Sequence, residues 1–326
     1  MIKNHKKLLM TTLIFFVIVL CHGTSIANSQ NHFTEGQRAY DLGNYVRAAE
    51  EMQLAAQAGH SEAQFFLGGL YEFGVGVEQN YQTTLSWWKK AAEQNHSMAQ
   101  NNLGVFYLEG HGVSQNFEEA VQWFKQAALN SLPLAQFNLA RMYANGLGVS
   151  QDGAKAAKWF EKSATQGYMK AQLFLGEMYD QGQDVEKNPE AALHWYRRAA
   201  NQGHPTAQNN IGVMYHTGRG VSQSFEKAEI WFRRAAERGH AMAQFNLGLI
   251  LLKGNGITKN NQHAYAWFNL SLLGGTSPAA KYLQQLEEDM NSVQIEKAKQ
   301  LMKTLRQRIH QELPDPHTIR SGPGAL

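Results

Sequence analysis

The sequence predicts an all-α solenoid built from repeated helix-loop-helix units, and two observations lead to this fold class. The dipeptide Ala-Gln recurs at a constant step of 36 residues, and apolar residues within each unit follow the spacing of helical faces. A fixed period of this kind is the sequence signature of a repeat array. The pairs lie at 63–64, 99–100, 135–136, 171–172, 207–208 and 243–244.

The first helix of each unit begins near the Ala-Gln pair, whose Ala is counted here as offset 0. Apolar residues at offsets 0, 4, 7 and 8 form one helical face. Offset 5 is Gly in five units, although Gly in mid-helix costs about 1 kcal/mol relative to Ala. We therefore expect a bulky Trp or Tyr of the neighbouring helix to occupy the space beside it. The column comprises Gly68, Gly104, Ala140, Gly176, Gly212 and Gly248.

A loop resembling Gly-x-Gly-Val separates the two helices of each unit. Its first residue is Gly in all six units, which predicts a helix end in the left-handed conformation. Its second residue varies, so His111 is one of several tolerated occupants. A residue of strong N-cap type then precedes the second helix: Asn80, Asn116, Asp152, Asn188, Ser224 and Asn260.

The second helix has apolar residues at offsets 21, 24, 25, 28 and 29, which again form one face. Offset 24 is Trp in every unit and is followed by another aromatic residue. The Trp column comprises Trp87, Trp123, Trp159, Trp195, Trp231 and Trp267.

The combined pattern AQxxLGxxYxxGxGVxxNxxxAxxWxxxAAxxG resembles the Sel1-like repeat family, a relative of the tetratricopeptide repeat with a longer loop. The resemblance is strong over residues 63–278. It implies an α/α superhelical solenoid of six repeats with a right-handed course. The departures Ala140, Asp184 and Leu251 are expected to change local packing without changing the fold.

The ends of the array are expected to be atypical, because terminal units of a solenoid have one face in water. Residues 28–62 are predicted to form an N-terminal cap, a partial repeat with a shortened loop. Residues 279–313 are predicted to form C-terminal capping helices. Residues 314–326 are rich in Pro and Gly and are predicted to be disordered.

Residues 1–27 have the anatomy of a secretory signal peptide. Three lysines precede an apolar run from Leu8 to Leu20, and Ser25-Ile26-Ala27 predicts cleavage before Asn28. An uncleaved anchor and a lipidated Cys21 are the alternatives. We therefore expect export through this signal, with a periplasmic or secreted location, or membrane anchoring if the segment is not cleaved.

The charge of the chain argues against nucleic-acid binding, and its cysteine content argues against stabilisation by disulfides. Removal of the signal segment takes three of the 30 Lys and Arg residues, which leaves 27 basic residues against 27 acidic ones. A neutral chain gives no support for nucleic-acid binding, which needs a basic surface. Cys21 is the only cysteine, so the processed chain must be stabilised without disulfides.

No motif in the sequence predicts an enzyme, a cofactor or a metal. His60, His96, His204 and His240 form a row before the first helices, but one ion cannot collect ligands from successive stacked repeats. The Gly-x-Gly loops lie between helices, whereas phosphate-binding loops follow a strand. A nucleophile elbow of the Gly-x-Ser-x-Gly type is missing from the sequence.

A solenoid of helix pairs offers a concave groove lined by the first helices. We expect offsets 2, 6 and 9 to be exposed there, and these columns vary between repeats as partner recognition requires. The predicted groove residues are Phe65, Asn101, Arg141, Leu173, Glu177, Asn209, His216 and Phe245. Asparagines at offset 3 either bond a peptide backbone or bond locally within the repeat, and the local role is favoured.

The function predicted from these observations is a protein–protein interaction scaffold of the bacterial cell envelope that binds a peptide or partner protein in the groove. One alternative is a secreted or surface factor for host interaction. Another alternative is a protein that binds peptidoglycan, or an enzyme that interacts with β-lactams. The enzyme is disfavoured because related repeats with that activity use cysteine pairs, which this chain lacks. No nucleic acid or metal is expected as a partner, and a monomer is expected.

Overall fold

The computed structural model describes residues 28–254 and 256–312, which form helices and contain no strand. The predicted signal peptide and the predicted disordered tail lie outside these residues. The described part falls into two compact units, residues 28–151 and 152–312. Within it, no helix is both long and apolar enough to span a membrane.

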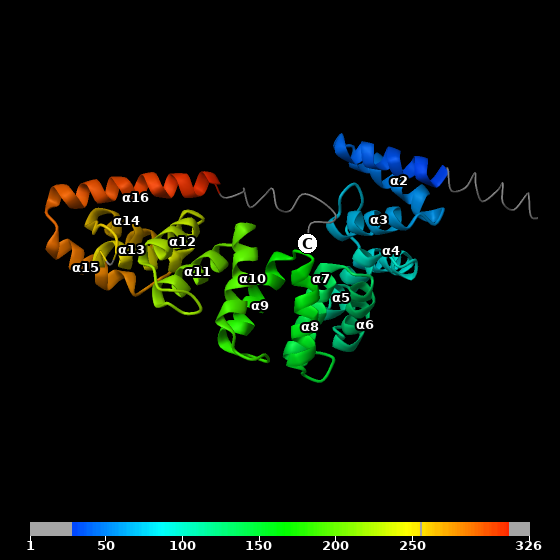
Figure 1. Ribbon diagram of the computed structural model, residues 1–326. Helices are drawn as coiled ribbons and strands as arrows, with labels where there is room; N and C mark the ends of the chain where they lie inside the picture. Colours follow the sequence, from blue (N-terminus) through cyan, green and yellow to red (C-terminus); the bar gives the residue numbers. More distant parts are fainter. Residues whose placement is uncertain (1–27, 255, 313–326) are drawn as a thin grey trace, which may run out of the picture. The chain divides into compact units, whose positions relative to one another are not determined.

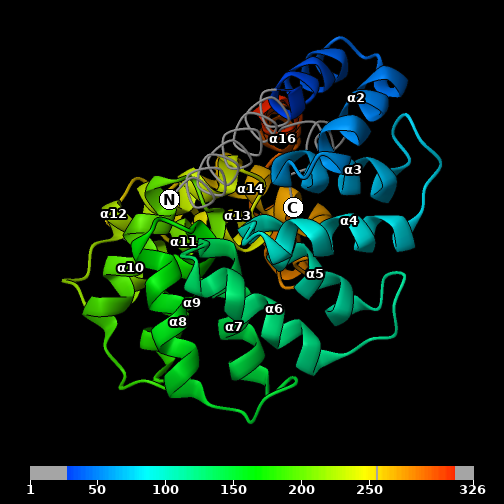
Figure 2. The ribbon, with the colours of Figure 1, turned by 90° about the vertical axis from the view of Figure 1, so that its right-hand side faces the viewer.

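The first unit begins with a helix over residues 28–41, which a short turn joins to α2. Consecutive helices then pack against each other in chain order, α2 on α3, α3 on α4, α4 on α5, α5 on α6 and α6 on α7 (Figure 2). The helices are α2 (Tyr45–Gln57), α3 (Ser61–Phe73), α4 (Tyr81–Glu93), α5 (Ser97–Glu109), α6 (Phe117–Leu129) and α7 (Pro133–Asn145).

The second unit continues the same pairing from α8 to α14 and ends with two capping helices. Helix α15 packs on α14, and the long helix α16 runs along α14 and also touches α12 (Figure 1). The helices are α8 (Gly153–Thr165), α9 (Met169–Gln181), α10 (Pro189–Asn201), α11 (Pro205–Thr217), α12 (Phe225–Glu237), α13 (Ala241–Lys253), α14 (Asn261–Leu273), α15 (Ala279–Asp289) and α16 (Ser292–Glu312).

The mid-helix glycines lie against aromatic rings, as predicted, although three of the five rings are Phe and not the expected Trp or Tyr. A Cβ atom on Gly104 would lie 2.6 Å from the ring of Phe124, which is much closer than a real contact. The ring belongs to the residue after the Trp column, so it is Trp, Tyr or Phe. The same contact joins Gly68 to Trp88, Gly176 to Tyr196, Gly212 to Phe232 and Gly248 to Phe268.

Four residues of the Trp column lie at the edge of the core and interact with a cation one turn further along the helix: Trp87, Trp159, Trp195 and Trp231. Trp267, in contrast, is fully buried. Lys90 Nζ lies 4.0 Å from the ring centroid of Trp87, and Arg234 lies over Trp231 at 4.7 Å. Such cation–π contacts cover apolar surface while the charge stays in water. The second helix thus has a solvated outer edge.

The loops between the helices are fixed by hydrogen bonds. The predicted glycine helix ends and N-cap residues of the second helices are confirmed. Gly110 ends α5 in the left-handed conformation, and the side chain of Asn116 accepts from the backbone N–H of Glu119 at 3.0 Å. The sequence did not reveal the role of Gln115, whose side chain donates to the carbonyl of Leu108. The GHGV segment is therefore a structural loop.

The third loop residue packs on the preceding repeat. Gly112 has φ of +64°, and a Cβ atom there would overlap Tyr81, the first residue of α4. In the fourth repeat Asp184 replaces this glycine and keeps a positive φ of 61°. The residue that faces it is Gly153, the first residue of α8, and a Cβ on Gly153 would overlap the Asp184 side chain. The two departures from the pattern therefore compensate each other.

This compensation predicts a strong coupling between the two positions. Gly153→Phe should destabilise the protein by about 1–3 kcal/mol, because the ring and the Asp184 side chain need the same space. Adding Asp184→Gly should recover most of that loss, because the pair then matches Phe117 and Gly148. Urea unfolding of the two single variants and the double variant measures the coupling, and additive effects would contradict the prediction.

Candidate functional site

The first helices of the repeats, α3, α5 and α7 in the first unit, present a surface that we call the helix-A face. The prediction that offset 2 is exposed on it is wrong. Phe65, Asn101, Leu173 and Asn209 are all buried, with Asn101 only 2% exposed. Phe245, also at offset 2, is half-buried. At offsets 6 and 9, Arg141 is exposed, and Glu177 and His216 are half-buried.

Offset 2 is buried because its side chain turns toward the next repeat. The ring of Phe65 stacks on the ring of His96, with centroids 4.6 Å apart. Asn138 Nδ2 donates to Asn101 Oδ1 at 2.9 Å, and Asn246 Nδ2 donates to Asn209 Oδ1 at 3.0 Å. Two asparagines of offset 3, Asn138 and Asn246, thus bond to the preceding repeat. The other two, Asn102 and Asn210, accept from the residue before them in their own repeat, as the sequence favoured.

A cavity of about 160 Å³ opens on the helix-A face of the first unit. Its floor is made by Trp88 and Phe106, whose ring centroids lie 4.8 Å apart in an edge-to-face arrangement. Trp88 is held in place because its Nε1 donates to the carbonyl of Phe65 at 3.0 Å. The other lining residues come from α3, α5 and α7: Glu72, Asn101, Asn102, Val105, Leu134 and Asn138.

The carboxyl of Glu72 is the one titratable group that lines this cavity. Burial, with a smaller contribution from the carboxyl of Glu109, raises the pKa of Glu72 to about 7. The cavity thus combines an aromatic floor, amide side chains and a carboxyl group. This set can hold an apolar side chain beside polar and cationic groups.

The family assignment rests on a repeat model that covers most of the chain. The Sel1 repeat model matches residues 61–96, 97–132, 133–168, 170–204, 205–240 and 241–275. The chain belongs to the Sel1 repeat family. No match was found among curated proteins.

Solved structures similar to this Sel1 repeat protein include a Sel1 repeat protein from Oxalobacter formigenes. It is 30% identical with a TM-score of 0.64, and the match covers 74% of this chain and 96% of that one. A protective antigen of uropathogenic Escherichia coli with an SLR fold is 26% identical, with a TM-score of 0.39 and coverage of 90% and 81%. An immunity protein from Pseudomonas aeruginosa is 19% identical, with a TM-score of 0.40 and coverage of 67% and 83%.

In the second unit, the Sel1 repeats bring acidic groups to the helix-A face. Arg219 donates to Asp180 Oδ2 at 2.8 Å. Burial and the nearby Asp180 raise the pKa of Glu177. Burial, Asp180 and Glu177 also raise the pKa of Tyr196. The predicted groove residue Glu177 therefore lies in an acidic setting that Arg219 partly balances.

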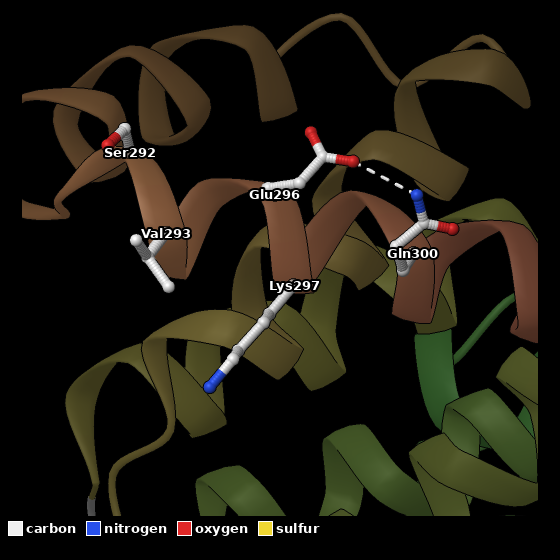
Figure 3. A pocket seen from close by; sticks show the side chains of 5 residues that line it. All are labelled: Ser292, Val293, Glu296, Lys297 and Gln300. Atoms are coloured by element: carbon white, nitrogen blue, oxygen red, sulfur yellow. Dashed lines mark hydrogen bonds between the residues drawn. The ribbon is translucent and has the colours of Figure 1, made fainter.

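A second hollow lies on the outer surface of α16 (Figure 3). It is lined by Ser292, Val293, Glu296, Lys297 and Gln300, which share one helix face, and Gln300 Nε2 donates to Glu296 Oε1 at 3.0 Å. One exposed helix supplies all five side chains, so the hollow does not gather groups from different elements. We therefore take the cavity of the first unit as the candidate site.

Three of the four residues of the histidine row cap a helix with their side chains, and His204 does not. Nδ1 of His60, His96 and His240 accepts from the backbone N–H three residues later at 3.1–3.2 Å. A ring that accepts at Nδ1 carries its proton at Nε2, and His96 Nε2 lies 2.9 Å from Glu62 Oε2. Across the part of the chain that the structure describes, no group of three or more His, Cys, Asp or Glu residues could hold a metal ion.

The glutamine of each Ala-Gln pair has a structural role that sequence reasoning missed. Gln100 is 1% exposed, and its Nε2 donates to the carbonyl of Ala92 at the end of the preceding helix. Equivalent bonds of 3.0–3.2 Å are made by Gln64, Gln136, Gln172, Gln208 and Gln244. The sequence pattern that could have revealed this role is the glutamine itself, a polar residue that recurs in every repeat next to the buried helical face.

The buried asparagine bridge predicts a stability effect. Asn101→Ala should destabilise the protein by about 1–3 kcal/mol, because the half-buried Asn138 Nδ2 loses its acceptor and the buried Asn101 amide is removed. Thermal or urea unfolding measures the change. Asn145→Ala is the control on the exposed end of α7 and should stay within about 0.5 kcal/mol. Equal effects of the two variants would contradict the inter-repeat bond.

The raised pKa of Glu72 predicts that the effect of Glu72→Gln on stability depends on pH. The folded protein holds this proton up to about pH 7, whereas the unfolded chain releases it near 4.5, so stability falls as the pH rises between these values. Glu72→Gln lacks this loss and should have a higher Tm than the parent at pH 8 but an equal one at pH 4. Exposed Glu93→Gln is the control, and a pH-independent difference for Glu72→Gln would contradict the burial of the carboxyl.

Proposed function

We propose that this Sel1 repeat protein is a scaffold of the bacterial cell envelope that binds a peptide or a partner protein on the helix-A face. Sel1 repeats are generally protein–protein interaction scaffolds and not enzymes. The location in the envelope rests on the signal-peptide pattern of residues 1–27.

The observation that carries this proposal is the contrast between the buried and the accessible parts of the helix-A face. The buried glutamines, glycines and apolar residues repeat with little change and hold the array together. The accessible side chains differ from repeat to repeat: offset 6 is Arg141 in one repeat and Glu177 in the next, and offset 9 is Glu72 in one repeat and His216 in another. A varied surface on a uniform frame gives each region of the face its own chemistry for a partner.

Photo-crosslinking in the native cell tests the binding face. A photoreactive amino acid at Arg141 on the helix-A face should give a discrete adduct. The same probe at Gln122, an exposed position on α6 in the same unit, is the matched control and should give none. Equal adducts, or none from Arg141, would overturn the assignment of the face. An adduct with peptidoglycan or with a host protein would favour the corresponding alternative.

The envelope location has a separate test. N-terminal sequencing of the protein from a periplasmic fraction should find a chain that begins at Asn28. Recovery of the unprocessed chain in the cytoplasmic fraction would contradict export while leaving the binding face intact.

A further inference from the structure

We propose that the cavity of the first unit is an anchor pocket for a peptide segment in which an aliphatic residue lies next to a lysine or arginine. This inference rests on the proposed function and names the chemistry of the partner. The aliphatic side chain would enter the cavity, the peptide group would bond to Asn102 and Asn138, and the cation would pair with Glu72.

The size and floor of the cavity suit one aliphatic side chain. Its volume of about 160 Å³ is well below the ~300–1,000 Å³ of pockets that hold drug-sized ligands. Trp88 and Phe106 are 1% and 2% exposed and lie fixed in the core, while Val105 and Leu134 form half-buried walls. Burial of a single apolar side chain in a rigid pocket of this size stabilises a complex, as is found for the anchor residues of protein interfaces.

The amide groups at the rim suit a peptide backbone. Asn102 Oδ1 accepts from Asn101, and Asn138 Nδ2 donates to Asn101. Among the described residues these are the hydrogen bonds of the two side chains, so Asn102 Nδ2 is left as a donor and Asn138 Oδ1 as an acceptor. A donor and an acceptor on one rim match the C=O and N–H of the backbone of a bound peptide.

The carboxyl of Glu72 determines the charge of the partner. In the second unit the equivalent residue is Asp180, which is already paired with Arg219 of the next loop. The equivalent of Arg219 in the first unit is His111, whose Nδ1 lies instead 3.4 Å from Glu109 Oε2. Glu72 forms no ion pair within the described residues, and Glu109 adds a second negative charge nearby. A lysine or arginine of the partner would supply the missing cation.

Fluorescence anisotropy with labelled peptide pools tests the pocket. The pools are Ac-X-X-Leu-Lys-X-X-NH2, the Leu-Glu analogue and the Ala-Lys analogue, measured against the folded full array at pH 8. The Leu-Lys pool should bind at least about tenfold more tightly than either analogue, since a tenfold change corresponds to about 1.4 kcal/mol.

Two variants assign the binding to this cavity. Val105→Trp fills the cavity and should weaken the Leu-Lys pool at least about tenfold. Val213→Trp, at the equivalent position of the second unit, is the matched control and should change binding less than twofold. Glu72→Gln should weaken the Leu-Lys pool about fivefold without affecting a Leu-Gln pool, and it keeps the test informative if Val105→Trp does not fold.

The outcomes separate the pocket from the general function. Equal binding of the three pools, or equal effects of the two tryptophan variants, would overturn the pocket assignment. If the Arg141 crosslink nevertheless persists in the Val105→Trp variant, the scaffold function stands and the anchor lies elsewhere. Loss of that crosslink in Val105→Trp but not in Val213→Trp supports both proposals.

Discussion

The contact between a mid-helix glycine and an aromatic ring is the constraint on which the other contacts of each repeat depend. Gly104 lets the edge of Phe124 lie against the backbone of α5, which sets the distance between the two helices of the repeat. The glycine helix ends and the N-cap residues fix where each helix begins and ends. The length of the loop between them is therefore constant. The helix propensity lost at glycine is offset by close packing, which an added Cβ would remove.

Hydrogen bonds of amide side chains join one repeat to the next. Gln100 ties the start of α5 to the end of α4, and Asn138 ties α7 to α5 through Asn101. Because these amides are buried or half-buried, water replaces their hydrogen bonds poorly. The bonds also require a defined orientation of the two partners. Apolar packing thus forms the repeat, while the amides set how successive repeats meet.

The fold could be predicted from the sequence because its determinants lie within one repeat. N-caps such as Asn116 depend on neighbours a few residues away, and the Gly column depends on an aromatic ring in the same repeat. Burial of Asn101 could not be predicted this way, because it depends on Asn138 in the next repeat. The cavity beside Glu72 was missed for the same reason, since four helices contribute its walls. Helical periodicity locates a residue relative to its own helix and leaves its neighbours in other repeats unspecified.

The pair formed by Gly153 and Asp184 has a consequence for how this array can change over evolutionary time. Repeat arrays lengthen and shorten by duplication and loss of whole units, which works best when units are interchangeable. A unit whose second helix begins with Phe, Tyr or Pro cannot precede the Asp184 loop without a clash. A rearrangement that separates the third repeat from the fourth is therefore expected to cost stability, whereas one that moves the two repeats together is not.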